Sequence, residues 1–138
     1  MIIMSAEKAK ELGLKPLARI VTSARGGCHP SVMGISPVPA VRNLLKNNPK
    51  FTVDSFDLIE VNEAFASQYL ACEKDLKLNR DKVNVNGSGI GLGHPVGSTG
   101  ARVILTLMYA LRKRGKTLGM ATLCGGGGVS MATVIEVL

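Results

Sequence analysis

The stretch NVNGSGIGLGHPVGSTGA, from Asn84 to Ala101, places His94 in a glycine-rich loop just before the longest helical pattern of the chain. Glycines permit the close approach of a ligand or of another loop, and Gly91, Gly93 and Gly97 are candidates for such a contact. The N–H groups that open a helix can bind an oxygen anion together with an imidazole. The loop therefore indicates an anion site, with a plain turn and a solvated histidine as the alternative.

Two nucleotide-binding patterns do not fit this loop. Walker A ends in a lysine followed by Ser or Thr, and no lysine lies between Lys82 and Lys113. The dinucleotide pattern GxGxxG fails because the segment that starts at Gly87 has Leu92 at the position of the last glycine. These mismatches argue against nucleotide hydrolysis.

The composition indicates a single globular domain. The chain has 138 residues, of which 46% are hydrophobic, enough to bury one core. Its net charge of +7 favours anionic partners. Basic residues are scattered, however, and only Arg112, Lys113 and Arg114 are consecutive. With few aromatic residues and no zinc-finger spacing, a nucleic-acid partner is not expected, whereas a small phosphorylated ligand suits the charge.

The cysteines predict a reducing compartment. Cys28, Cys72 and Cys124 are an odd number without CxxC spacing, in a chain without a signal peptide pattern, so we expect free thiols and a cytoplasmic location. No metal site is expected, because Cys28 and its neighbour His29 have no third ligand at suitable spacing. No apolar run approaches the roughly 20 residues of a membrane span, so no membrane partner is expected either.

Strand and helix patterns alternate along the chain, which predicts an α/β fold. Met1 to Met4 has the character of a first strand that has been cut short. We expect a five-stranded, mostly parallel mixed sheet with helices on both faces and the last strand antiparallel. The expected strands are Leu17–Ala24, Phe56–Val61, Val83–Asn86, Lys116–Cys124 and Val129–Leu138, and the helices include Ala6–Leu12, Ala40–Asn47, one carrying Phe65, Tyr69, Cys72 and Leu76, and Gly100–Arg114, with Ala101, Ile104, Leu105, Met108 and Leu111 on its apolar face.

Three polar residues stand at the carboxyl ends of expected strands or in the loop after one: Asn62, His94 and Cys124. In open α/β sheets the active-site crevice lies at this edge, so these side chains could share one site. Taken singly, Asn62 could instead cap the following helix, and Cys124 could be a buried core thiol. A Cys and a His suggest either a nucleophilic thiolate with its base or a thiol acting in proton transfer, and spacing does not decide between them.

The motifs together resemble the C-terminal half of a thiolase of the acetyl-CoA acetyltransferase type. The blocks that match are Asn62-Glu63-Ala64-Phe65, Gly93-His94-Pro95 and Cys124 before its glycines. The loop Met33 to Ala40 and the NVNG of Asn84 to Gly87 match as well. The likeness therefore runs over nearly the whole chain, and the blocks occur in the order and at the separations typical of the family.

This resemblance implies a role for each site residue. His94 would activate a nucleophilic cysteine supplied by the N-terminal half, and with a water held by Asn62 it would stabilise the oxyanion of a thioester enolate. Cys124 would remove the α-proton of the second acetyl-CoA, or protonate the departing thiolate of CoA in the reverse direction. The backbone N–H of Gly126 would contribute to a second oxyanion hole.

The resemblance also implies substrates and partners. Acetyl-CoA and acetoacetyl-CoA would be the substrates, with no further cofactor and with Ala64 and Phe65 in the substrate pocket. The N-terminal half of the enzyme would be missing from residues 1–138, and the intact enzyme would be a homo-oligomer, a dimer or tetramer. We therefore expect the isolated chain to be inactive. Gly125 departs from the pattern, because many relatives have a bulkier residue after the cysteine.

Three other functions remain open from the sequence. A 3-ketoacyl-CoA thiolase of fatty-acid degradation would share all three blocks. A self-contained thioesterase would use Cys124 and His94 as nucleophile and base. A CoA-binding or assembly domain without catalysis would need neither side chain.

Overall fold

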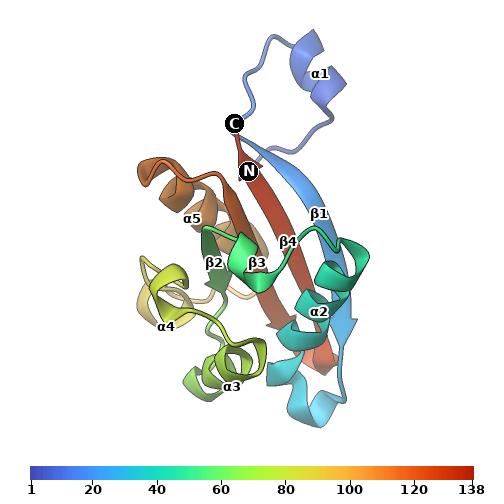
Figure 1. Cartoon of the computed structure of the whole chain (residues 1–138), viewed down its shortest axis with the longest axis vertical. Helices are drawn as coiled ribbons and strands as arrows, with labels where there is room; N and C mark the ends of the chain where they lie inside the picture. Colours follow the sequence, from blue (N-terminus) through green and yellow to red (C-terminus); the bar gives the residue numbers. More distant parts are fainter.

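Four strands form one mixed sheet in the computed structural model, which describes residues 1–138 (Figure 1). The sheet order is β1-β4-β3-β2. β1 and β3 each pair antiparallel with β4, and β2 pairs parallel with β3. The strands are β1 (Ala18–Gly27), β2 (Leu58–Val61), β3 (Leu118–Gly125) and β4 (Val129–Val137).

The α/β class, the mixed sheet and the antiparallel last strand are confirmed, but the expected strand number is wrong and the pairings are not mostly parallel. β1, β2 and β3 point the same way, as crossover connections require. β4, however, lies between β1 and β3, so both of its pairings are antiparallel. The strand expected at Val83–Asn86 is reduced to a bridge between Val83 and Ile59. Met1 to Met4 forms no strand and lies exposed, because no other segment pairs with it.

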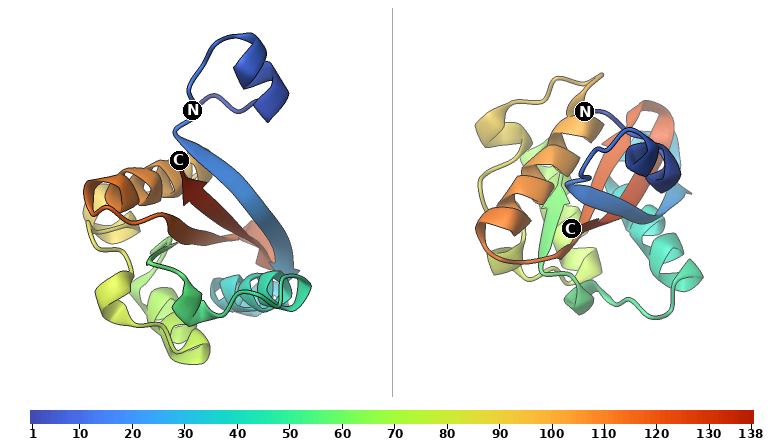
Figure 2. Two further views of the ribbon diagram at one scale, coloured as in Figure 1. Left: turned by 45° about the horizontal axis from the view of Figure 1, so that its top comes forward. Right: turned by 90° about the horizontal axis from the view of Figure 1, so that it is seen from above.

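Helices cover both faces of the sheet, as expected (Figure 2). α2 (Pro37–Asn47) and α3 (Ala66–Leu76) lie on one face, and α5 (Thr99–Lys113) lies on the other. α1 (Ala6–Glu11) stands away from the sheet at the top of Figure 1. Short helical segments complete the chain: η1 (Pro30–Ile35), η2 (Val53–Ser55), η3 (Arg80–Lys82), α4 (Gly89–Leu92) and η4 (Gly126–Gly128).

The hydrophobic core has two parts, one on each face of the sheet. Fourteen buried residues pack between the sheet and the α2/α3 side, with Leu44, Phe56 and Met120 among the largest. Eight more pack under α5. β2 is buried along its whole length, since both of its faces are covered. This burial fixes the direction in which the end of β2 delivers the next residue, Asn62.

α5 meets the sheet with only part of the apolar face that its sequence predicts. Met108 and Leu111 are buried as expected, and Ile104 and Leu105 pack partly buried against the same cluster, but Ala101 and Leu105 also border an open groove. Their places in the core are taken by Val103, Leu107 and Ala110. The helix is apolar on both sides, so periodicity alone does not identify the side that meets the sheet. No helix of the structure is both long and apolar enough to span a bilayer.

Candidate active site

The carboxyl ends of β2 and β3 bring two of the expected site residues to one edge of the sheet. Val61, the last residue of β2, pairs with Thr122, and the backbone N–H of Asn62 donates to Thr122 O at 3.0 Å. Cys124 follows two residues after Thr122 on the same strand. The parallel ladder therefore sets Asn62 beside the segment that carries Cys124.

Asn62 and His94 are in contact at this edge. Asn62 Nδ2 lies 3.5 Å from His94 Nδ1, and His94 Nδ1 also lies 2.7 Å from Thr99 Oγ1 in the first turn of α5. Asn62 and Thr99 are fully buried, whereas His94 is half-buried. The helix-cap alternative for Asn62 is wrong, because the residue at the N-cap of α3 is Phe65.

The loop that carries His94 is anchored by Glu63. Ile90 N–H donates to Glu63 Oε2 at 3.1 Å, and a Cβ at Gly89 would stand 2.5 Å from Glu63 O. Only glycine permits this approach, so the close contact of the loop lies at Gly89. Gly91, Gly93 and Gly97, which the sequence indicated for such a contact, face open space.

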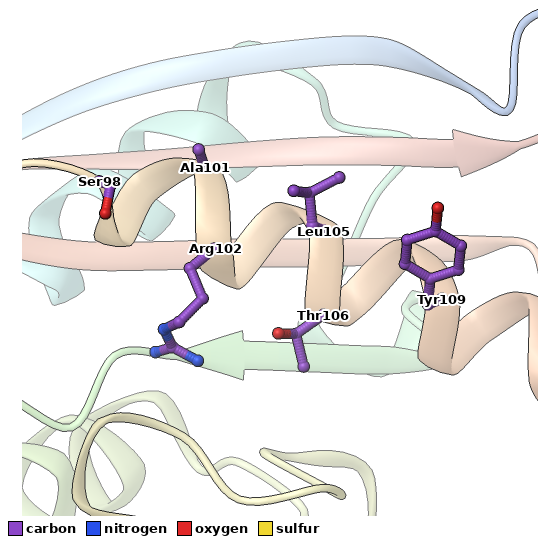
Figure 3. Close-up of a pocket in the computed structure, with 6 residues that line it drawn as sticks. All are labelled: Ser98, Ala101, Arg102, Leu105, Thr106 and Tyr109. Atoms are coloured by element: carbon purple, nitrogen blue, oxygen red, sulfur yellow. The ribbon is translucent and has the colours of Figure 1, made fainter. Parts of the chain in front are cut away.

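A buried polar cluster lies behind Asn62. Arg102 Nη2 lies 3.4 Å from both Asn62 Oδ1 and Ser88 Oγ. Figure 3 shows the guanidinium of Arg102 reaching from α5 toward the end of β2. Glu60 is 1% exposed, and burial raises the pKa of its carboxyl to about 7, although Arg102 and Ser88 act in the opposite direction. The carboxyl of Glu60 is thus buried beside the site with the guanidinium of Arg102 as its charged neighbour.

Cys124 lies at the end of β3 and is partly exposed, so the alternative of a sealed core thiol is wrong. Burial is the main cause that raises the pKa of its thiol; the sulfur of Cys28 adds to the shift, and the backbone N–H of Cys124 opposes it. A thiol with a raised pKa holds its proton at neutral pH, so it can donate that proton and can act as a proton acceptor only after the proton has been given up. No hydrogen bond joins Cys124 Sγ to Asn62 or His94.

The glycine turn after Cys124 is held by one close approach. Cys28 N–H donates to Gly128 O at 2.9 Å. Gly128 has φ +86°, and a Cβ there would stand 2.3 Å from Cys28 O. Gly126, at the start of the turn, is exposed to solvent. The turn is thus fixed at its far end and open at Gly126, next to Cys124.

The other two cysteines do not form a second reactive centre. Cys72 is fully buried on α3, and burial raises the pKa of its thiol to about 11. Its Sγ lies 3.5 Å from Gly34 O. Cys28 Sγ lies 3.4 Å from Val32 O. No group of three His, Cys, Asp or Glu side chains is placed to hold a metal ion.

An open groove of ≈ 540 Å³ lies between η1 and α3. Val32 and Phe65, 53% and 62% exposed, line it together with Met33. Phe65, which the resemblance assigned to a substrate pocket, is thus one of the exposed side chains that line this groove. Ala64, assigned to the same pocket, precedes Phe65 and lies outside the lining of the groove.

The family model for the C-terminal domain of thiolase matches residues 14–137. The chain belongs to the thiolase family. It is 52% identical to an acetyl-CoA acetyltransferase of Syntrophomonas wolfei, over 99% of this chain but 35% of that protein. This thiolase domain therefore spans about a third of the length of the curated relatives it matches.

Solved thiolase structures share the fold of this domain. The crystal structure of the Bacillus anthracis acetyl-CoA acetyltransferase superposes with a TM-score of 0.93 at 56% identity, covering 98% of this chain and 34% of that one. A human mitochondrial 3-ketoacyl-CoA thiolase in complex with CoA superposes with a TM-score of 0.92 at 46% identity, covering 97% and 34%. Both kinds of thiolase are thus similar to this domain over nearly its whole length.

Sequence reasoning missed three residues that surround Asn62 and His94. None of Thr99, Glu60 and Arg102 was singled out as a site residue. One signal was available for each charged residue, since a carboxylate inside a buried strand and an arginine in the first turn of an apolar helix both require partners. Glu60 and Arg102 lie close together only because α5 packs against β2, and local sequence patterns do not predict that packing.

Proposed function

We propose that this chain supplies the C-terminal catalytic part of a thiolase that condenses two acetyl-CoA molecules to acetoacetyl-CoA and CoA, or catalyses the reverse thiolysis. The observation that carries the proposal is the contact between Asn62 and His94 beside the strand that carries Cys124. Membership of the thiolase family supports it, as do relatives named acetyl-CoA acetyltransferase.

In the condensation, Cys124 first gives its proton to the departing thiolate of the first CoA; the resulting thiolate then takes a proton from the methyl group of the second acetyl-CoA, and the C–H electron pair passes into an enolate. The enolate oxygen accepts a hydrogen bond from the His94 imidazole and another from a water held by Asn62. The enolate carbon then attacks an acetyl group carried on a cysteine outside this chain. A C–C bond forms, the acyl C–S bond breaks with its electron pair returning to the sulfur of that cysteine, and acetoacetyl-CoA leaves.

Formation of the enolate depends strongly on both hydrogen-bond donors and a base. A thioester α-proton is a weak acid, so the enolate requires fixed donors, each worth on the order of 100 to 1,000-fold in rate. A positioned base contributes about 100 to 10,000-fold. The exposed N–H of Gly126 would stabilise the tetrahedral oxyanion formed when the enolate attacks. The groove at Phe65 would take the acyl-pantetheine arm of CoA along its apolar side chains.

A chimera tests the proposal. The segment of the Syntrophomonas wolfei acetyltransferase that lies N-terminal to the region similar to this chain is fused to the N-terminus of this chain. Thiolysis of acetoacetyl-CoA by this chimera is then measured. We expect turnover by the chimera, none by the isolated chain, and a loss of about 100 to 10,000-fold on Cys124→Ser or His94→Ala. Cys28→Ser is the matched control and should retain activity. Turnover that survives both site substitutions would refute the proposal.

Two further measurements separate the alternatives. An acetyl group found by peptide mass spectrometry on Cys124 of the isolated chain after exposure to acetyl-CoA would favour a self-contained thioesterase. CoA binding that survives joint replacement of Asn62, His94 and Cys124, without any turnover in the chimera, would favour a binding domain. A higher kcat/KM for long 3-ketoacyl-CoA than for acetoacetyl-CoA would favour a degradative thiolase.

A further inference from the structure

The side-chain amide of Asn62 lies between a charged donor and an imidazole. Arg102 Nη2 lies 3.4 Å from Asn62 Oδ1, and Asn62 Nδ2 lies 3.5 Å from His94 Nδ1. A guanidinium group carries donors only, so the amide atom that faces it must be the carbonyl oxygen. The NH₂ end of Asn62 is thereby turned toward His94.

The orientation of this amide determines where the imidazole of His94 carries its proton. A ring nitrogen that faces an amide N–H must accept a hydrogen bond. The other neighbour of Nδ1 is Thr99 Oγ1 at 2.7 Å, a hydroxyl that can either donate or accept. Thr99 therefore allows both tautomers, whereas Asn62 selects one. With Nδ1 as acceptor, the neutral ring carries its hydrogen on Nε2.

Arg102 is held in place for this task by buried groups. Its Nη2 also lies 3.4 Å from Ser88 Oγ, and Ser88 Oγ donates to Val61 O at 3.3 Å, which leaves a lone pair of Ser88 for the guanidinium. Ser88 and Asn62 are both fully buried. The carboxyl of Glu60, 1% exposed on β2, lies close enough to Arg102 for the guanidinium to oppose the rise in its pKa.

We propose that Arg102 is a positioning residue which, through the amide of Asn62, holds His94 in the tautomer with its proton on Nε2. The catalytic meaning rests on the proposed function. An enolate oxygen needs a hydrogen-bond donor, and Nε2–H provides one. The opposite tautomer would present a lone pair to the anion and would lose one donor of the oxyanion hole, an effect of roughly 100 to 1,000-fold in rate.

Nitrogen NMR of the ¹⁵N-labelled chain tests the tautomer directly. Spectra are recorded at about pH 8, where an ordinary imidazole is neutral. We expect the His94 proton on Nε2 in the natural chain and in Arg102→Lys, because lysine still donates to Asn62 Oδ1. Arg102→Met should move the proton toward Nδ1 as the amide turns over. Arg112→Met, which removes an exposed charge from the same helix, is the matched control and should leave the spectrum unchanged.

Two results would overturn the inference: a proton on Nδ1 in the natural chain, or a folded Arg102→Met variant with the natural spectrum. If Arg102→Met does not fold in a thermal melt, Asn62→Asp provides the same information. A carboxylate accepts only, so the proton of His94 should move to Nδ1, and retention on Nε2 would contradict the inference.

The chimera separates this inference from the proposed function. There, Arg102→Met should lower kcat by roughly 100 to 1,000-fold with little change in KM, and Arg102→Lys should recover most of the loss. A chimera that is inactive even with the natural residues would count against the proposed function, while the NMR result for the chain would still decide the tautomer.

Discussion

Glu60 is a carboxyl group buried in the interior, and its ionisation should couple folding to pH. It lies on β2 with Arg102 from α5, Ser88 before α4 and Glu63 after β2 as its polar neighbours. Glu60 Oε2 and two nitrogens of Arg102, Nε and Nη1, are buried without hydrogen-bond partners. The opposite charges therefore offset each other only in part, and the neutral carboxyl is favoured in the folded chain.

The pH dependence of stability follows from the raised pKa of Glu60. The pKa of Glu60 is about 7 in the folded chain, above the value of 4.5 in the unfolded chain. The stability that Glu60 contributes to the fold is therefore fully present below pH 4.5 and is lost as the pH rises to about 7. The loss amounts to about 3 kcal/mol at most. In urea titrations at several pH values, the unfolding free energy of the natural chain should fall relative to Glu60→Gln across this window. Glu11→Gln, an exposed control on α1, should show the same pH dependence of the unfolding free energy as the natural chain. If the Glu60→Gln variant also shows that pH dependence, the prediction is contradicted.

At the level of elements, Asn84 replaces a strand at the edge of the sheet. Its Oδ1 accepts from Val61 N–H and its Nδ2 donates to Val61 O, both at 2.9 Å. Nδ2 also lies 3.3 Å from Glu63 Oε1. The backbone adopts φ +49°, which asparagine tolerates better than most residues. One side chain thus satisfies the edge of β2 directly before Asn62.

Replacement of Asn84 by Ala should lower the unfolding free energy by about 1–3 kcal/mol, because the edge of β2 loses its partners. Alanine also tolerates the positive φ of this position poorly, whereas glycine adopts it freely. Asn84→Gly therefore removes the amide without adding backbone strain and separates the loss of hydrogen bonds from the strain. Asn86→Ala, at an exposed position three residues from the Val83 bridge, should change stability by about 0.5 kcal/mol or less. Urea denaturation measures all three. Full stability of the glycine variant would show that the hydrogen bonds contribute nothing.

The same region shows how far the sequence predicts the structure. The patterns located β2, β3, β4 and α5 to within a few residues, because alternation, apolar runs and glycine stops are local signals. The insertion of β4 between β1 and β3 depends on pairing between distant segments, which no local pattern encodes. The replacement of a fifth strand by Asn84 is also a tertiary effect.

In the site, too, the residues in local motifs were predictable, whereas those brought in by tertiary packing were not. Asn62 and His94 stand in short motifs whose residue types already suggest chemistry, and the structure brings their side chains into contact. Cys124 is placed at the end of the neighbouring strand. Arg102 and Thr99 enter the site only through the direction in which α5 packs. That direction is undetermined in the sequence, because α5 is apolar on two sides.

At the scale of the whole molecule, the second apolar side of α5 is uncovered. Ala101, Leu105 and Tyr109 border an open groove of ≈ 410 Å³, and Tyr109 is 57% exposed (Figure 3). A helix with apolar residues on more than one side is typical of the interior of a larger protein. Since the chain spans about a third of the length of its relatives, we expect the attached N-terminal part of the chimera to cover this side.

Tyr109→Glu tests this expectation in two settings. In the isolated chain the side chain is exposed, so the change should alter the unfolding free energy by about 0.5 kcal/mol or less. In the chimera, where α5 would be covered, a buried carboxylate should cost several times more and lower the thermal midpoint. Lys113→Glu, an exposed change at the end of the same helix, should have a small effect in both proteins. Equal effects of Tyr109→Glu in the two proteins would show that this side of α5 stays open to solvent, so that the added part of the enzyme must dock elsewhere.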